Sequence, residues 1–129
     1  MPVLSSGLKA ESSLLNLKAI DIKDVRQEVY NLLVSGENII SAFKTIRDQV
    51  VFTDKRIFVI NVQGVTGKKT SYFSYPYSKV QYFAIETAGV LDIDSELILT
   101  FSNGSTLELE FKSNVDIRSI SQAIAHFIL

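Results

Sequence analysis

The sequence predicts a mostly β, α+β domain in which a small barrel of antiparallel strands is closed by one C-terminal helix. Three observations indicate this fold. Short apolar and β-branched runs, separated by tight turns, follow one another from residue 39 to residue 111. The last two runs alternate strictly between apolar and polar side chains, and an amphipathic helical pattern then ends the chain.

Length and composition restrict the class of protein. The 129 residues suffice for one domain, and 47% hydrophobic with 21% charged residues excludes a disordered chain. The net charge of −1 gives no general attraction for nucleic acid. The absence of cysteine removes disulfides and thiolate sites, and neither a signal peptide nor a spanning apolar run is expected. We therefore expect a cytoplasmic protein without cofactor.

The first 35 residues are expected to form a helical extension before a domain of residues 36–129. The first twelve residues are small and polar, and a short helix containing Leu14, Leu15 and Leu17 is expected to follow. A longer helix should begin at a capping Asp21 and stop at Gly36. Its apolar face consists of Ile22, Val25, Val29, Leu32 and Leu33.

Seven strands are expected after Gly36. They lie near residues 39–47, 49–53, 56–62, 70–76, 79–87, 95–102 and 105–111. The Asn103-Gly104 step between the last two strands favours a tight hairpin, because both residues tolerate a positive φ. Pro76 favours a sheet edge or a turn at the end of its strand, since proline has no N–H for the sheet ladder.

The last helix is expected to begin at Ser113 or Asn114, with Asp116 in its first turn. Its apolar face consists of Ile117, Ile120, Ile124, Phe127 and Ile128. A sheet with one apolar face needs a cover, so this helix should act as the lid of the barrel. Ile124 and Phe127 should then both be buried.

Three phrases in the middle of the chain have a characteristic spacing: TDKRIF at residues 53–58, QGVTGKK at residues 63–69 and ETAG at residues 86–89. With the strand IDSELILTFSNG and the final helix, this segment resembles the short bacterial pleckstrin-homology-like proteins over about residues 36–129. The resemblance implies a seven-stranded, partly open barrel of two near-orthogonal antiparallel sheets, with the C-terminal helix over one opening. It also implies a homo-oligomeric ring, a pentamer, and no catalytic activity.

The chain departs from lipid-binding pleckstrin-homology domains at one loop. Domains that bind phosphoinositides use a long basic loop between their first two strands, whereas residues 46–49 read Ile-Arg-Asp-Gln. This connection is too short to surround a headgroup, and it contains an acid. Phosphoinositide recognition is therefore not expected here.

No constellation of residues indicates catalysis or a metal site. Gly64 to Ser71 lacks the spacing and the following helix of a phosphate-binding loop. His126 is the only histidine, and Asp92, Asp94 and Glu96 lack the spacing of a calcium loop. Asp48 with Asp54, or Glu108 with Glu110, could serve as acid–base pairs, but no nucleophile accompanies them. No catalytic, cofactor-binding or metal-binding residue is assigned.

Charge is divided unevenly along the chain. Residues 44–79 carry seven cations and two anions, a net +5, whereas residues 86–110 carry six anions and no cation. Differently charged solvated strands would explain this division, and so would a head-to-tail contact between copies. Tyr75 and Tyr77 could lie in the core or in an exposed aromatic patch. The candidate interface or anion-binding residues are Lys68, Lys69, Tyr75, Tyr77, Glu108 and Glu110.

These observations favour a non-enzymatic, ring-forming homo-oligomeric module that binds or scaffolds a protein or peptide. The alternative is peripheral binding to an anionic lipid, or to a small anionic ligand, through the basic loop of residues 63–69. The expected partners are further copies of the chain and an unidentified protein or peptide. No nucleic-acid partner is expected, and a membrane is the less favoured partner.

Overall fold

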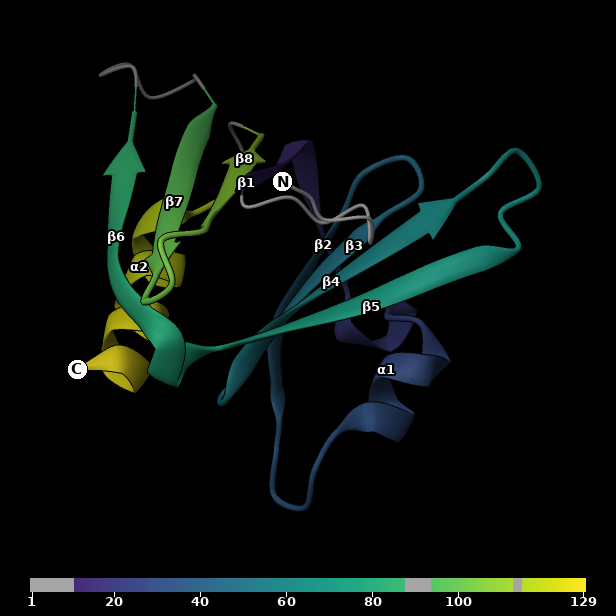
Figure 1. The fold of residues 1–129 in the computed structure, drawn as a ribbon, viewed down its shortest axis with the longest axis horizontal. Helices are drawn as coiled ribbons and strands as arrows, with labels where there is room; N and C mark the ends of the chain where they lie inside the picture. The colour runs from purple at the N-terminus through teal and green to yellow at the C-terminus, as the bar shows by residue number, and fades with distance from the viewer. Residues whose placement is uncertain (1–10, 88–93, 113–114) are drawn as a thin grey trace. The chain divides into compact units, whose positions relative to one another are not determined.

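The computed structural model describes residues 11–87, 94–112 and 115–129, as two compact units (Figure 1). We call Lys18–Tyr77 the central unit, and we call the residues up to Leu17 together with Ser78–Leu129 the terminal unit. The elements in chain order are β1 (Glu11–Ile20), the 3-10 turn η1 (Ile22–Asp24), α1 (Gln27–Leu32), β2 (Ile39–Lys44), β3 (Gln49–Thr53), β4 (Arg56–Gln63), β5 (Lys69–Pro76), the 3-10 turn η2 (Tyr77–Lys79), β6 (Val80–Glu86), β7 (Ser95–Phe101), β8 (Thr106–Phe111) and α2 (Ile117–Ile128).

The central unit is an antiparallel sheet in the order β5-β4-β3-β2, to which the last residues of β1 add. One face of this sheet packs on Val25, which lies between η1 and α1, and on Val29 of α1; both residues are buried. The sheet residues in that cluster are Ala42, Val51, Phe58 and Ile60. The other face is also buried, and there the rings of Phe43 and Phe52 meet edge to face, with centroids 5.7 Å apart. Because both faces are covered, β3 and β4 read as continuous apolar runs.

The terminal unit contains the antiparallel strands β6, β7 and β8, with β1 parallel to β8. Alternation along β7 and β8 buries one face. Its buried residues are Leu97, Leu99, Phe101, Leu107, Leu109 and Phe111. Between the two strands, Gly104 has a φ of 89° and its N–H donates to the Phe101 carbonyl at 2.9 Å. The predicted hairpin is confirmed, with a four-residue loop.

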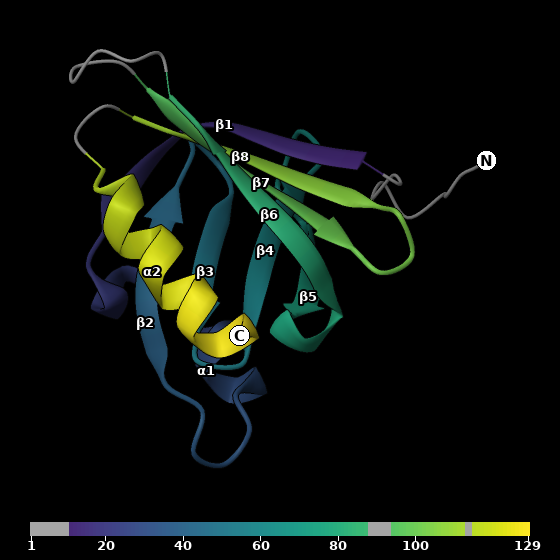
Figure 2. The ribbon, with the colours of Figure 1, turned by 90° about the vertical axis from the view of Figure 1, so that its left-hand side faces the viewer.

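Helix α2 contacts β6 and β7 within the terminal unit (Figure 2). Asp116 caps the helix, because its carboxylate accepts the N–H groups of Arg118 and Ser119 at 3.1 and 3.3 Å. The helix therefore begins at Ile117, later than predicted; Ser113 and Asn114 lie outside the described residues. Ile124 is buried as predicted, but Phe127 is only half-buried, with its ring edge-on to His126.

The predicted helix at Leu14, Leu15 and Leu17 is wrong, because Glu11–Ile20 is the strand β1. Asn16 has a positive φ of 62°, and the register with β8 shifts between Leu14 and Leu17. This bulge lets two residues three apart in sequence face the same side of a strand: Leu14 lies opposite Leu109, and Leu17 opposite Phe111. The bulge therefore produces in a strand the three-residue spacing of apolar residues that is typical of a helix.

The helix predicted over residues 21–35 is present in two shorter pieces. Asp21 caps η1 by accepting the Lys23 N–H at 2.9 Å, and α1 ends at Leu32. Gly36 does not stop the helix; with a φ of 81° it lies in a turn closed by the bond from the Glu37 N–H to the Val34 carbonyl. The seven predicted strands correspond to β2 through β8. The domain boundary at residue 36 stays a prediction.

Candidate functional site

Two turns of the central unit meet through one arginine. Thr45 and Asp48 close the β2–β3 turn, where the Thr45 N–H donates to the Asp48 carbonyl at 2.9 Å. Gly64 and Gly67, with φ of 82° and 69°, shape the β4–β5 turn. The guanidinium of Arg47 donates to the Gly64 carbonyl at 2.6 Å, which holds the two turns side by side. Positive φ at both glycines explains why the sequence uses glycine there.

This end of the central unit is basic and partly apolar, and we call it the basic tip: Ile46, Arg47, Val65, Lys68 and Lys69. All five residues are exposed, and both aliphatic side chains are fully so. The nearby carboxylate of Asp48 accepts the Val62 N–H at 2.9 Å and the Asn61 amide at 3.3 Å. Asp48 is thus engaged by the sheet.

The tyrosines differ in placement. Tyr77 is buried, and its hydroxyl donates to the Thr53 carbonyl at 2.8 Å. Burial raises the pKa of Tyr77, and the charges of Asp54 and Glu37 raise it further. Tyr77 therefore belongs to the core of the central unit. Tyr75 is half-buried on β5, opposite Ile57.

Four carboxylates gather on one face of the terminal-unit sheet, and we call this set the acidic face: Glu86, Glu96, Glu108 and Glu110. Glu96 lies between Glu86 of β6 and Glu110 of β8 in the strand register. Partial burial raises the pKa of Glu96, as do the charges of the other three carboxylates. The Asn16 N–H donates to Glu110 at 3.3 Å. The predicted proximity of Glu108 and Glu110 is consistent with this arrangement.

The acidic face does not form a metal site. Among the described residues, no group of three or more His, Cys, Asp or Glu side chains could hold a metal ion. Asp92 lies outside the described residues. The imagined pair of Asp48 and Asp54 serves two different turns, since Asp54 accepts the Asn38 N–H at 3.2 Å.

Strand β6 forms an edge beside the acidic face. Among the described strands it pairs only with β7, and five of its seven residues are exposed. Tyr82 is 61% exposed on the same side as Glu86, and Ile85 is 38% exposed on the other. β5 forms the other edge and ends at Pro76, as the proline predicted. Unpaired backbone groups along such edges can accept another strand.

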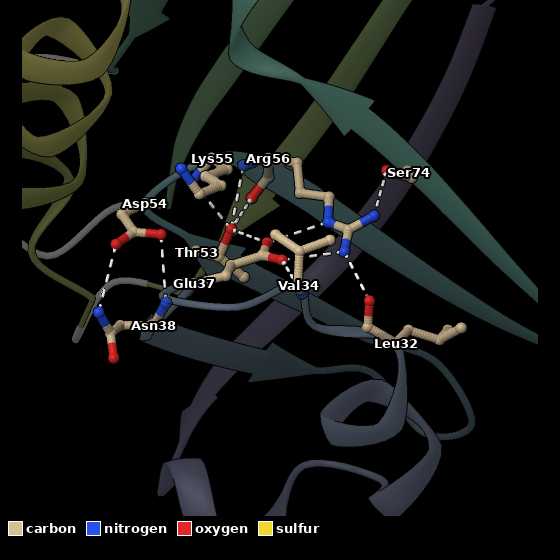
Figure 3. A network of polar contacts seen from close by, with 9 residues as sticks. All are labelled: Leu32, Val34, Glu37, Asn38, Thr53, Asp54, Lys55, Arg56 and Ser74. Carbon is tan, nitrogen blue, oxygen red and sulfur yellow. Dashed lines mark hydrogen bonds and ion pairs between the residues drawn. The ribbon is translucent and has the colours of Figure 1, made fainter.

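No local pattern in the sequence predicts the ion pair between the buried Glu37 and the half-buried Arg56 (Figure 3). The guanidinium donates through Nε and Nη2 to the two carboxylate oxygens, both at 2.9 Å, and Nη2 also donates to the Leu32 carbonyl at 2.8 Å. The Thr53 hydroxyl lies 2.6 Å from Glu37, and the Arg56 guanidinium lies 4.2 Å from the Phe58 ring centroid.

This network is structural. Burial alone would raise the pKa of Glu37, but hydrogen bonds from Arg56, Thr53 and Val34 outweigh it and lower the pKa. Every atom of the pair that needs a partner is used inside the central unit, which ties the end of α1 to the β3–β4 turn. Arg56 thus contributes little free charge to the +5 band of residues 44–79.

Comparison with known proteins identifies the class. A family model described as Bacterial PH domain matches residues 9–128, and the chain therefore belongs to the bacterial pleckstrin-homology (PH) domain family. Two uncharacterised proteins of Bacillus subtilis are similar to it. YjqA is 39% identical over 121 residues, 92% of this chain and 93% of YjqA, and YozO is 38% identical over 93 residues, 72% and 80%.

Solved structures show the same fold. The crystal structure of a DUF1696-family protein with a pleckstrin-homology domain from Shewanella loihica has a TM-score of 0.78 at 40% identity, covering 89% of this chain and 99% of that chain. A pleckstrin-homology domain from Shewanella amazonensis has a TM-score of 0.65 at 40% identity, covering 85% and 90%. The predicted family and the mostly β fold class are confirmed. None of the helices among the described residues combines the length and the hydropathy that a membrane span requires.

Proposed function

We propose that the chain is a non-enzymatic module whose copies assemble head-to-tail into a closed ring, with five subunits expected, and that the ring binds or scaffolds a protein or peptide in the cytoplasm. One observation carries the proposal. The central unit exposes Arg47, Lys68 and Lys69 at the basic tip, whereas the terminal unit presents the four carboxylates of the acidic face.

The charge arrangement favours a contact between the basic tip of one copy and the acidic face of another. Partial burial raises the pKa of Glu96, and repulsion by Glu86, Glu108 and Glu110 raises it further. An incoming cation would relieve that repulsion, and a two-fold contact of acidic face on acidic face would increase it. Unlike surfaces joined in a repeating contact generate either a ring or a filament, and closure gives the ring.

The first test reverses the charge of the basic tip. The variant Lys68→Glu/Lys69→Glu should lose molar mass by light scattering while keeping the wild-type unfolding midpoint, because both side chains are exposed. Adding Glu108→Lys/Glu110→Lys to the same chain should restore part of the assembly. The control Lys23→Glu/Lys55→Glu changes two exposed lysines elsewhere and should stay assembled. A monomeric wild type at micromolar concentration would refute the ring.

The basic tip also favours a second candidate function, peripheral binding to anionic lipid through the loop of residues 63–69. Ile46 and Val65 project fully exposed aliphatic side chains beside three cations. Aliphatic groups can enter the lipid boundary while cations meet anionic headgroups, each worth about 1 kcal/mol near the surface.

Vesicle sedimentation tests this second function. The protein should bind vesicles containing about 30% phosphatidylglycerol but not pure phosphatidylcholine, and Ile46→Ser/Val65→Ser should weaken binding without a change of charge. Equal recovery of wild type and variant in the supernatant would exclude lipid attachment by the tip.

A further inference from the structure

The hairpin turn between β7 and β8 contains the one asparagine of the sequence that a glycine follows. Asparagine stands at positions 16, 31, 38, 61, 103 and 114, and Leu, Ile or Val follows every one of these except Asn103. A branched side chain shields the backbone nitrogen that comes after an asparagine, whereas Gly104 leaves that nitrogen open to close approach. Asn103 and Gly104 are both exposed.

The side-chain amide of Asn103 is held over the turn by Ser105. Its Oδ1 accepts the Ser105 N–H at 3.0 Å and the Ser105 hydroxyl at 2.7 Å. Because a backbone N–H can only donate, the bonded atom is the amide oxygen, and the hydroxyl donates to it as well. The bond from the Ser105 N–H closes a ring that includes the Gly104 backbone, so Cγ of Asn103 lies on the side of the Gly104 nitrogen.

Two donors on Oδ1 favour attack at the amide carbon. They withdraw electron density from Cγ of Asn103, and they stabilise the negative charge that forms on Oδ1 when a nucleophile adds. Two other asparagines differ, since the amides of Asn38 and Asn61 donate to carboxylates. Their acceptors are Asp54 at 3.4 Å and Asp48 at 3.3 Å. A neighbouring carboxylate opposes the negative charge that the same attack would create there.

We propose that Asn103 is a site of spontaneous deamidation in the folded protein and that Ser105 promotes the reaction. The Gly104 N–H gives its proton to hydroxide, and the nitrogen attacks Cγ of Asn103. The Cγ–Nδ2 bond then breaks, and the amide nitrogen takes a proton from water and leaves as ammonia. Water opens the resulting cyclic succinimide. Attack at the side-chain carbonyl gives aspartate, and attack at the backbone carbonyl gives isoaspartate, in which the chain continues through the former side chain.

The reaction requires a brief opening of the turn. The Gly104 N–H donates to the Phe101 carbonyl at 2.9 Å, and this bond must break before the nitrogen loses its proton. Exposed turns open far more readily than the interior of a sheet. Either product adds a negative charge to the turn. Isoaspartate also lengthens the backbone between two bonded partners, the Phe101 N–H and the Ser105 carbonyl, which lie 2.9 Å apart.

Peptide mapping by mass spectrometry tests the proposal. Folded protein is incubated at mildly alkaline pH, and the conversion of amide to carboxyl is followed at each asparagine. Asn103 should convert first, with isoaspartate among its products. A sample unfolded in urea and incubated alongside gives the rates without the hairpin. If Asn103 stays unchanged in the folded protein while it converts in the unfolded chain, the hairpin protects the amide and the proposal is overturned.

A serine variant tests the role of the hydroxyl. Ser105→Ala should slow the conversion of Asn103 in the folded protein by at least about threefold, because one donor to Oδ1 is lost. The same change should have no effect in urea, where no turn brings Ser105 to the amide. Ser102→Ala, at the exposed serine before Asn103, is the control and should leave the rate unchanged.

Equal unfolding midpoints of the wild type and both variants would establish that folded proteins are being compared. A folded Ser105→Ala protein that converts as fast as the wild type would overturn the role of Ser105. Equal slowing by Ser105→Ala in the folded and unfolded chains would do the same, since the effect would then not depend on the turn.

Discussion

In the central unit the carboxylate of Glu37 is surrounded by donors from Arg56, Thr53 and Val34, whereas in the terminal unit Glu96 is surrounded by three other carboxylates. Glu37 lies just before β2, and Glu96 lies in β7. Their pKa values shift in opposite directions. Burial acts to raise both, but hydrogen-bond donors outweigh it at Glu37 and lower that pKa, whereas the neighbouring carboxylates add to it at Glu96. The difference indicates that the central unit uses charge to fix its own turns. In the proposed assembly, the like charges of the terminal unit would instead meet the cations of a neighbouring copy.

The largest effect is expected when Glu37 loses its ion-pair partner. Arg56→Met should lower the free energy of unfolding by about 3–5 kcal/mol, because Glu37 would stay buried without its cation. Chemical denaturation measures the loss. Lys55→Met, at the exposed neighbour, serves as the control and should stay within about 0.5 kcal/mol. An equal small effect of both variants would contradict a structural role for the ion pair.

A second prediction concerns the apolar side of the terminal unit. Ile124→Ala should lower the free energy of unfolding by about 2–5 kcal/mol, since Ile124 is 1% exposed. Phe127→Ala should cost less, because Phe127 is only half-buried although the helical pattern treats both residues alike. Thermal and urea unfolding of the two variants would rank them. The reverse ranking would mean that the end of α2 packs more tightly than described.

The smallest expected effect is the different pH dependence that Glu37 and Glu96 give to the free energy of unfolding. The lowered pKa of Glu37 gives stability that is present above the ordinary value of 4.5 and is lost as the pH falls through the lowered pKa. The raised pKa of Glu96 gives repulsion that is complete above the raised pKa and is relieved as the pH falls toward 4.5.

Substitution by glutamine separates these two contributions. Glu96→Gln should raise the free energy of unfolding near pH 7 by about 0.2–1 kcal/mol, as expected when a like charge is removed from a cross-strand pair. The gain should vanish near pH 4.5. Glu37→Gln should instead be destabilising near pH 7, and by less as the pH falls. A destabilising Glu96→Gln would show that the acidic face contains a compensating cation.

Local chemistry made β2 through β8 and α2 predictable. Tight turns at Asp54 and Gly104, alternation in β7 and β8, and the cap at Asp116 each act within a few residues. β1 was not predictable in this way, because its parallel partner β8 lies some 95 positions later and its bulge at Asn16 breaks the alternation. Tertiary pairing decided its structure.

The candidate site was predictable only in part. Alternation placed Glu108 and Glu110 on one side of β8, and glycine spacing placed Lys68 and Lys69 beside a turn. The joining of Arg47 to Gly64 and of Glu37 to Arg56 depends on contacts 17 and 19 residues apart, which no local pattern contains. Tyr77 is likewise buried where its hydroxyl bonds to Thr53, 24 residues away in sequence.

The parallel pairing of β1 with β8 has a consequence for synthesis on the ribosome. The ladders of the central unit join strands that are close in sequence, so they can form while the chain is still emerging. Residues 11–17 are made well before their partners, residues 106–111. Until then β1 has no ladder on that side, and long-range pairing of this kind folds slowly. A variant truncated before residue 18 would leave the same side of β8 unpaired in the finished protein.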